Sequence, residues 1–420
     1  MNTASANDAA GRGREKIAWV RSHMPILAAL EEELRPARPF AGFRIALSIH
    51  LEAKTARLAL ALKELGAEVA VASSNPLSAK DDVVAALSGE VATHARYGAS
   101  EAEYTAFLER VLAIRPHLVL DDGGDLCALL HGARHDLGAD VIGACEETTT
   151  GLVRLRQLAR DGRLLFPVVA VNDARMKHLF DNRHGTGQSV WDAIMRATNL
   201  LVAGKRVLVV GYGSCGRGIA DRARGLGAHV TVAEVDPVRA AEALLEGFPV
   251  STVHAAIPSA EFVITATGCI GAVTFDDLCA APDGAILANA GHFDVEIDVQ
   301  SLRARAAGRR VRDHVEEFTL PNGNRVHLLA EGRLVNLVAG DGHPAEIMDL
   351  SFAVQLLSLL WLARSGRGFA PGVYPVPAEV DEEVARRFLG SRGVRIDTLT
   401  PDQRAYLGLC GRGPTFSPSP

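Results

Sequence analysis

Residues 205–218 read KRVLVVGYGSCGRG, and this stretch decides the fold of half of the chain. The run Lys205–Val210 is rich in valine, which is typical of a buried strand. A helical pattern follows the glycines, and a second strand is predicted over His229–Val235. Strand, glycine loop, helix and strand together predict a βαβ unit. The glycines have the spacing GxGxxG and stand at Gly211, Gly213 and Gly216.

This glycine loop predicts a dinucleotide site. Gly211 permits the tight turn, Gly213 lets a pyrophosphate approach the backbone, and Gly216 allows close packing of helix on strand. The N-terminus of the helix then presents free N–H groups to the phosphates. Glu234, near the end of the next strand, can accept hydrogen bonds from ribose hydroxyls, and its charge disfavours a 2′-phosphate. We therefore expect NAD rather than NADP; a glycine-rich turn without a ligand is the alternative.

The first half of the chain also alternates short β-branched runs with helical patterns, which indicates a second parallel α/β sheet. A helix is predicted over Glu52–Leu65, with Leu58, Leu62 and Leu65 on one face. Strands are predicted over Phe43–Ile49, Glu68–Ala72, Leu118–Leu120, Asp140–Ile142 and Val168–Val171. The expected fold class is α/β, with two doubly wound parallel-sheet domains and a small C-terminal segment.

Polar residues follow several of these strands. Because ligands bind outside the carboxyl ends of parallel strands, this half is predicted to be a substrate domain. The alternative for each residue taken alone is a helix cap or a turn. The residues concerned are His50, Asp121, Asp122, Glu146, Glu147, Asn172 and Asp173.

Composition narrows the class of protein. The chain has 420 residues, 48% hydrophobic and 22% charged, with a formal net charge of −6. These values predict two or three globular domains and give no sign of binding to nucleic acid or membrane. The N-terminus has no apolar core of a signal peptide, and no run approaches the ~18 apolar residues of a membrane helix. Six scattered cysteines predict buried reduced thiols in a cytoplasmic enzyme, with no metal site.

Beyond the glycine loop, motifs along residues 14–410 resemble the adenosylhomocysteinase (S-adenosyl-L-homocysteine hydrolase) family, and they keep one order throughout. The likeness is greatest to its shorter archaeal and thermophilic-bacterial branch, as HLEAKT at His50–Thr55 suggests. The motifs are Asp121–Leu126, Glu146–Gly151, Val171–Asp173 with Lys177 and Phe180–Asn182, Asn289–Ile297, Leu329–Asn336 and Gly342–Pro344.

The resemblance implies an unusual reaction. The ribose 3′-OH is first oxidised to a ketone by tightly bound NAD⁺, which acidifies the C4′ proton. A base removes that proton, the 5′ substituent leaves, water adds to the resulting alkene, and the ketone is reduced again. The cofactor supplies the hydride chemistry, while the protein supplies position and proton transfer.

Site residues are carried over by matching motif. Lys177 would accept the 3′-hydroxyl proton, and Asp181 and Glu147 would hold the ribose hydroxyls. Asp122 resembles the base near C4′. His50 and His292 would transfer protons at C5′. For each of these residues, the alternative is an ordinary structural role, such as a satisfied core histidine or a surface lysine.

Further positions resemble binding residues. The adenine side would be formed by Glu52, Lys54, His343 and Met348, although a methionine in an apolar stretch is more often part of the core. NAD would be contacted, besides the three glycines and Glu234, by Thr148, Thr149, Thr150, Asn182, Thr267 and Asn336.

The resemblance also implies the domain plan. Residues 1–180 and 345–375 would form the substrate-binding domain, and residues 181–344 the NAD-binding Rossmann domain, with a hinge between them. Residues 376–420 would form a C-terminal segment that packs on a neighbouring subunit of a homotetramer or homodimer.

The chain departs from the family pattern near the substrate motifs. Ser78-Ala-Lys-Asp81 stands where Ser-Thr-Gln-Asp is usual, Cys127 where threonine is usual and Cys145 where serine is usual. The ending Phe416–Pro420 lacks the usual lysine and tyrosine, so we expect NAD to bind less tightly. These changes put the 5′ leaving group in question.

Three hypotheses follow. We expect hydrolysis of S-adenosyl-L-homocysteine to adenosine and homocysteine. The alternative is a specialised dehydratase that forms a 4′,5′-unsaturated adenine nucleoside, as angustmycin-type antibiotic biosynthesis requires. A catalytically inactive regulatory relative is the third, and the intact catalytic set argues against it.

Overall fold

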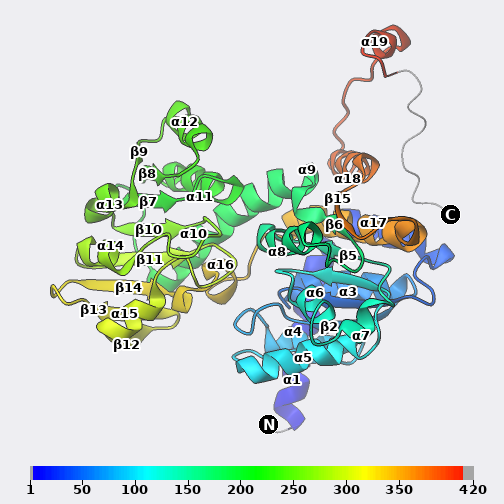
Figure 1. Ribbon diagram of the computed structural model, residues 1–420, viewed down its shortest axis with the longest axis horizontal. Helices are drawn as coiled ribbons and strands as arrows, with labels where there is room; N and C mark the ends of the chain where they lie inside the picture. Colours follow the sequence, from blue (N-terminus) through cyan, green and yellow to red (C-terminus); the bar gives the residue numbers. More distant parts are fainter. Residues whose placement is uncertain (1–2, 410–420) are drawn as a thin grey trace. The chain divides into compact units, whose positions relative to one another are not determined.

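The computed structural model describes residues 3–409 and divides the chain into two units (Figure 1). The first unit is Met1–Lys177 with Met348–Pro420, and the second is His178–Ile347. Each unit is built on its own sheet, dominated by parallel strands. The predicted fold class, two α/β units with parallel sheets, is confirmed.

The sheet of the first unit has seven parallel strands in the order β15-β6-β5-β4-β1-β2-β3. The chain runs outward from β1 through β2 to β3, and then from β4 through β5 to β6 on the other side. The strand order therefore reverses between β1 and β4, which is where such folds bind ligands. The strands are β1 Arg44–Ser48, β2 Glu68–Ala72, β3 Ala92–His94, β4 Leu118–Asp121, β5 Gly143–Glu146, β6 Pro167–Ala170 and β15 Gly372–Pro375.

Helices cover this sheet. Leu108, Leu126, Leu137 and Leu155 carry α5 to α8 onto one face, in a core that includes Ala46, Val119 and Ala144 of the strands. The helices α1 and α2 pack against α3, and α1 also packs against α4. The helices are α1 Thr3–Ser22, α2 Pro25–Leu34, η1 Arg35–Ala37, α3 Ala53–Glu64, α4 Asp81–Leu87, α5 Glu101–Leu112, α6 Asp125–Leu130, α7 His135–Gly138, α8 Thr149–Arg160, η2 Val171–Asp173, α9 Arg175–Lys177, α17 Ala345–Ser365, η6 Gly366–Gly368, α18 Ala378–Ser391 and α19 Pro401–Tyr406.

The sheet of the second unit has eight strands in the order β12-β13-β14-β11-β10-β7-β8-β9. The strands β12, β13 and β14 pair antiparallel, and the others pair parallel. Here the order reverses between β7 and β10. The strands are β7 Arg206–Val210, β8 His229–Ala233, β9 Val250–Ser251, β10 Phe262–Thr265, β11 Ala285–Asn289, β12 Ala307–Arg312, β13 Val315–Thr319 and β14 Arg325–Leu329.

The second unit opens with a π-helix, η3, an uncommon form that is often found at functional sites. A core of buried side chains, including Leu208, Val263 and Leu328, lies on its sheet. The helices are η3 His178–Gly185, α10 Thr186–Thr198, α11 Ser214–Gly225, α12 Pro237–Leu245, α13 Val253–Ala256, η4 Ile257–Ser259, α14 Phe275–Ala280, α15 Val299–Arg305, η5 Ala330–Gly332 and α16 Val335–Val338.

Most of the predicted elements are found within one or two residues. The helix expected over Glu52–Leu65 is α3, and Leu58, Leu62 and Leu65 are fully buried. The strand predicted over Asp140–Ile142 is wrong, because the strand is β5, Gly143–Glu146. Asp140 instead forms an ion pair with Arg115 outside the sheet.

One expectation about membranes also needs correction. Residues 345–368 form a helical stretch that is long and apolar enough to span a membrane by length and composition. However, 72% of its most apolar window is buried inside the structure. Every residue from Asp349 to Leu360 of α17 is buried, so α17 serves as a core helix.

The cysteines match the sequence prediction only in part. Cys127 and Cys145 are buried, whereas Cys215 and Cys279 are half-buried and Cys269 is exposed; all five are free thiols. Cys410 and the terminal stretch Phe416–Pro420 lie outside the described residues. The described N-terminal residues form the beginning of α1 from Thr3 onward.

Candidate active site

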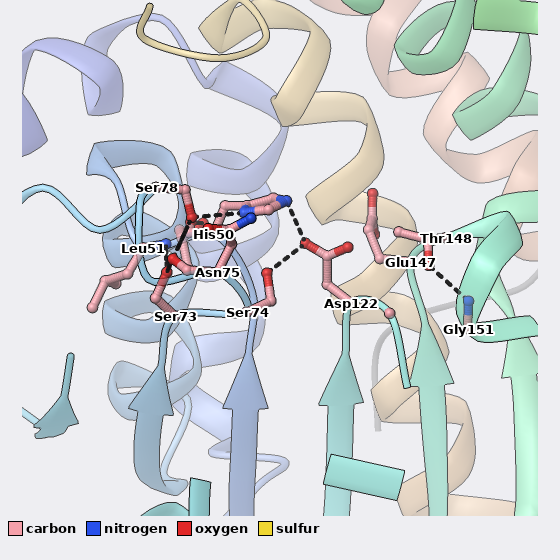
Figure 2. Close-up of polar contacts among 12 residues, drawn as sticks. His50, Leu51, Ser73, Ser74, Asn75, Ser78, Asp122, Glu147, Thr148 and Gly151 are labelled. Atoms are coloured by element: carbon pink, nitrogen blue, oxygen red, sulfur yellow. Dashed lines mark hydrogen bonds and ion pairs between the residues drawn. The ribbon is translucent and has the colours of Figure 1, made fainter. Parts of the chain in front are cut away.

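His50 and Asp122 meet at the switch point of the first sheet (Figure 2). His50 follows β1 and Asp122 follows the adjacent strand β4, so both side chains stand at the carboxyl ends of neighbouring strands. Nε2 of His50 lies 3.4 Å from Oδ2 of Asp122. Asp122 is buried and His50 keeps 13% of its side chain exposed. This pair joins a carboxylate and an imidazole, the two groups most used for proton transfer.

Serines after β2 hold this pair in place (Figure 2). The Ser74 hydroxyl donates to Oδ2 of Asp122 at 3.2 Å, and Nδ1 of His50 lies 2.8 Å from Oγ of Ser78. Ser78 in turn donates to the carbonyl of Asn75 at 2.9 Å. Neither serine was predicted as a site residue, because serines in a loop also form ordinary turns.

Glu147 and Lys177 form a second buried pair at the same edge of the sheet. Glu147 follows β5, beside β4, and Lys177 ends α9. Nζ of Lys177 lies 3.3 Å from Oε1 of Glu147, with about 6% of the Lys177 side chain exposed. Nε2 of Gln355, a fully buried residue of α17, donates a short hydrogen bond to Oε2 of Glu147. Gln355 was not predicted, because α17 shows only an apolar pattern in sequence.

A second layer of acids lies beneath Asp122 and Glu147. Asp121 and Glu146 are register partners on β4 and β5, and both are completely buried. Burial raises the pKa of Asp121 to about 7, and burial together with the charge of Asp121 raises the pKa of Glu146.

These inner acids accept hydrogen bonds from the turns that carry the outer ones. Oδ1 and Oδ2 of Asp121 accept the N–H groups of Asp122 and Cys127 at 3.2 and 2.8 Å. Oε1 of Glu146 accepts those of Gly123 and Thr148 at 3.0 and 2.9 Å. The inner layer therefore fixes the backbone of both outer acids.

Glu52 and Lys54, predicted on the adenine side, form a buried ion pair. Nζ of Lys54 lies 2.7 Å from Oε2 of Glu52, and each side chain is less than 10% exposed. Glu52 also caps α3, because its carboxylate accepts the N–H groups of Lys54 and Thr55. Burial of two opposite charges costs desolvation, and the ion pair and the capping hydrogen bonds offset part of that cost here. The adenine-side role of both residues stays a prediction.

The glycine loop in the second unit has the predicted geometry. Gly211 has φ +96°, and a Cβ on it would lie 2.7 Å from the carbonyl of Ala266. A Cβ on Gly216 would lie 1.9 Å from the carbonyl of Gly211, so this turn packs tightly on its own helix. Glu234 accepts the N–H of Tyr212 at 2.6 Å, which ties the end of β8 to the loop.

Two observations test whether this unit fits a dinucleotide. A Cβ on Gly213 would meet only the guanidinium of Arg239 at 3.6 Å, so the protein's own packing does not require glycine there. A ligand that approaches the backbone does require it. Oδ1 of buried Asn336 has no partner among the described residues, while its Nδ2 donates to Ser189 at 3.1 Å. A buried acceptor of this kind suits a ligand N–H group, so the residues fit NAD.

Asp181 and His343 lie together in the second unit. Nδ1 of His343 is 2.5 Å from Oδ1 of Asp181, and its Nε2 is 3.2 Å from the hydroxyl of Thr186. Asp181 is buried on η3, and the predicted NAD contact Asn182 follows it in the same π-helix.

Glu296 organises the loops that carry Thr267 and His292. Its carboxylate is buried and accepts the hydroxyl and the N–H of Thr267, both at 2.8 Å, and the N–H of Gly268 at 2.8 Å. A Cβ on Gly291 would lie 1.6 Å from Oε1 of Glu296. Half-buried His292 stacks edge-on with Phe293, with ring centroids 4.7 Å apart. Glu296 lies in a motif that the sequence analysis quoted without assigning it a role.

Comparison with known proteins agrees with this geometry. The profile of the S-adenosyl-L-homocysteine hydrolase family matches residues 4–139, and the profile of its NAD-binding domain matches residues 182–342. Adenosylhomocysteinase of Thermotoga maritima is 53% identical over 397 residues, which cover 94% of this chain and 98% of that protein. The chain belongs to the S-adenosyl-L-homocysteine hydrolase family.

Two archaeal relatives are similarly close. Adenosylhomocysteinase of Pyrococcus abyssi is 52% identical over 402 residues, covering 95% of each chain. S-inosyl-L-homocysteine hydrolase of Methanopyrus kandleri is 52% identical over 401 residues, also covering 95% of each chain. The predicted likeness to archaeal and thermophilic-bacterial members of the family is confirmed.

Membership of the hydrolase family settles several predictions. The chain is an adenosylhomocysteinase-type enzyme that acts on an adenine nucleoside, and NAD is its cofactor. The dehydratase hypothesis is not favoured, because the matching family is described as a hydrolase family and these relatives are named adenosylhomocysteinases. The inactive-relative hypothesis is not favoured for the same reason.

The departures from the family pattern lie mostly in the core. Cys127 is fully buried at the start of α6, next to Asp121, and burial together with the charge of Asp121 raises the pKa of its thiol. Cys145 is fully buried within β5. Lys80 precedes α4, and its N–H donates to the carbonyl of Leu51 at 3.0 Å. The two cysteines are therefore buried, and Cys127 lies beside Asp121 of the inner acid layer. The effect of these departures on the 5′ leaving group stays a prediction.

The remaining predicted residues are placed without a test of their roles. Thr148 caps α8 by accepting the N–H of Gly151 at 3.1 Å, and Thr149 accepts a hydrogen bond from Asn172 at 3.1 Å. Thr150 lies in the same first turn, and Met348 is half-buried near the start of α17. Their contacts with cofactor or substrate stay predictions.

Proposed function

We propose that this enzyme catalyses the reversible hydrolysis of S-adenosyl-L-homocysteine to adenosine and homocysteine. The observation that carries the proposal is that two pairs of proton-transfer groups lie at the same edge of the first sheet. His50 lies against Asp122 and Lys177 against Glu147, so the site has groups for proton transfer at more than one ribose position, in a chain of this hydrolase family.

Bound NAD supplies the oxidation and later reduction of the ribose 3′ carbon. Lys177 takes up the proton of the 3′-hydroxyl, and Glu147 orients both the lysine and the ribose. Asp122 then removes the C4′ proton, held by the Ser74 hydroxyl. His50 protonates the leaving sulfur at C5′ and deprotonates the incoming water.

The second unit contributes further groups to this proposal. His292 shares proton transfer at C5′, and Asp181 accepts a ribose hydroxyl. The glycines of the loop, Glu234 and Thr267 hold NAD, and Asn336 offers its buried Oδ1 to the cofactor. Thr148, Thr149, Thr150 and Asn182 complete the proposed cofactor contacts.

We also propose the molecular setting. The first unit, with its buried Glu52–Lys54 pair, binds the substrate, and His343 and Met348 add to the adenine side. A homotetramer or homodimer, with residues 376–420 against a neighbouring subunit, is proposed from the family resemblance. Free thiols at the five described cysteines support a cytoplasmic location.

Release of homocysteine tests the proposed reaction. The purified holoenzyme is mixed with S-adenosyl-L-homocysteine, and free thiol and adenosine are measured together. We expect the two to appear in equal amounts. Loss of one water from adenosine without thiol release would instead support the dehydratase.

A second candidate substrate carries hypoxanthine in place of adenine. The Methanopyrus kandleri relative is named as an S-inosyl-L-homocysteine hydrolase. The Glu52–Lys54 pair offers an acceptor and a donor side by side, which suits either base edge. Competition between the S-adenosyl and S-inosyl substrates decides the preference, and Lys54→Gln is expected to change the ratio of their kcat/KM values. An unchanged ratio would remove this pair from base recognition.

A further inference from the structure

We propose that Gln355 is a positioning residue for the Glu147–Lys177 pair, and that it aims Glu147 so that Lys177 can work as a base. This role rests on the function proposed above for Lys177. Gln355 lies on α17, more than two hundred residues from Glu147 in sequence, and it is fully buried. A polar side chain without exposure needs a reason, since its burial is unfavourable unless hydrogen bonds replace water.

The hydrogen bond fixes how the amide must be oriented. Nε2 of Gln355 donates to Oε2 of Glu147, whereas the other oxygen of Glu147, Oε1, faces Nζ of Lys177 at 3.3 Å. A carboxylate only accepts, so the amide group must present its NH₂ to it. The carboxylate is therefore held at both oxygens, by a neutral amide from α17 and by a cation from α9.

The neutrality of Gln355 matters for the chemistry. Lys177 has to exchange a proton with the substrate, so the charge beside Glu147 changes during the cycle. A second cation would hold Glu147 in the same place but would add a fixed positive charge to this buried site. An amide holds the carboxylate in one orientation without adding charge, and hydrogen bonds to ionised groups are among the stronger ones.

Gln355→Met tests the proposal, because methionine has a similar length and lacks the donor. The full-length holoenzyme is mixed with adenosine, and the rate of nicotinamide reduction is followed by its absorbance. We expect a fall of about 10- to 100-fold, the usual effect of losing one hydrogen bond to a charged group. Calorimetry should show a much smaller change in the Kd for adenosine.

Ser358→Ala is the matched control. Ser358 is fully buried on the same helix, and its Oγ has no partner among the described residues. Deleting this hydroxyl alters α17 without touching Glu147, so nicotinamide reduction should stay within about twofold of the wild type. If Gln355→Met does not fold, Gln355→Asn replaces it, since the shorter amide does not reach Glu147.

A double-mutant cycle separates positioning from a general effect on folding. In a Glu147→Gln background, Gln355→Met should slow reduction by less than about twofold, because the partner of the amide is already altered. A full additive loss, or a Gln355→Met rate equal to that of Ser358→Ala, would overturn the role of Gln355. A wild-type protein that holds NAD but never reduces it would overturn the proposed function, and the role of Gln355 with it.

Discussion

At the scale of single residues, the candidate site consists of two layers of acids with different duties. Asp122 and Glu147 form the outer layer and contact His50 and Lys177. Asp121 and Glu146 form the inner layer and accept backbone N–H groups. At the ends of β4 and β5, the first acid therefore holds the backbone in place and the next one is proposed to act on the substrate.

Replacing Asp122 by asparagine should separate oxidation from elimination. The amide cannot take the C4′ proton, so exchange of that proton with deuterated solvent should slow by about 10²- to 10⁴-fold. Nicotinamide reduction by adenosine should persist, since it does not use Asp122. Ser74→Ala, which removes only the 3.2 Å donor to Asp122, should have a far smaller effect. Unchanged exchange in Asp122→Asn would exclude Asp122 as the base.

The inner acids should make stability depend on pH. The pKa of Asp121 is raised to about 7 and that of Glu146 is also raised, both mainly by burial. The folded protein therefore binds these protons more tightly than the unfolded chain. Their contribution to stability is present below the unfolded pKa of about 4 and is lost as pH rises through about 7.

Glu146→Gln should flatten this dependence. Oε1 of Glu146 accepts three hydrogen bonds and Oε2 has no partner among the described residues, so glutamine reproduces the protonated side chain. Urea unfolding at about pH 8 should show a higher free energy of unfolding than in the wild type, because the variant carries no buried charge at this position. At about pH 4 the two proteins should be alike. Glu68→Gln, at an exposed position, is the control. A free energy of unfolding that depends on pH in the same way in Glu146→Gln as in the wild type would contradict the account.

At the scale of elements, two carboxylates from the C-terminal part of the chain cap short helices of the N-terminal part. Asp349 of α17 accepts the N–H groups of Ile26 and Leu27 of α2, both at 2.8 Å. Asp381 of α18 accepts those of Arg175 and Met176 of α9, at 2.7 and 2.8 Å. A helix N-terminus has unpaired N–H groups and a partial positive charge, so both contacts are favourable.

These two caps form a matched pair of variants. Asp349→Ala leaves buried N–H groups unpaired and should lower the free energy of unfolding by about 1–3 kcal/mol, with little change in turnover. Asp381→Ala should slow nicotinamide reduction by about tenfold or more, because α9 ends in Lys177 and small displacements of a catalytic group are costly. Denaturant titration and rapid-mixing absorbance measure the two effects. If both variants lost stability and catalytic rate to the same extent, the separate roles given to Asp349 and Asp381 would be contradicted.

At the scale of the whole molecule, each unit is a complete sheet fold with its own switch point. The second unit is one continuous segment, His178–Ile347, whereas the first is assembled from two. A continuous segment with its own core should be able to fold alone. Whether the second unit binds NAD by itself can therefore be tested directly.

Residues 178–347 expressed alone should fold and bind NAD but should not release homocysteine. NAD at about 100 times its Kd should stabilise the fragment by about 2.7 kcal/mol. Gly213→Val is the control: the fragment should still fold, because a Cβ there meets only Arg239 at 3.6 Å, but it should lose NAD. A fragment that stays unfolded, or a variant that binds NAD normally, would argue against this assignment.

Much of this architecture could be predicted from local sequence signals. The glycine spacing after Arg206–Val210 predicted the dinucleotide fold, because strand, turn and helix all agree there. The site residues that were missed depend on long-range packing. Gln355 is one polar residue in an apolar helix, and Ser74 is one loop serine among several, so neither has a local signature. The strand β5 was predicted too early in the chain, because Gly143 and Ala144, with which it begins, have weak strand propensity.

The central claim is that the ribose 3′ carbon is oxidised before the 5′ bond breaks. Rapid mixing of the NAD-loaded enzyme with S-adenosyl-L-homocysteine, with nicotinamide absorbance and thiol release recorded together, tests this order most directly. The account predicts that reduced nicotinamide appears before any thiol and that Lys177→Met slows both signals. Thiol release at full rate without reduced nicotinamide, or in the Lys177→Met variant, would contradict it.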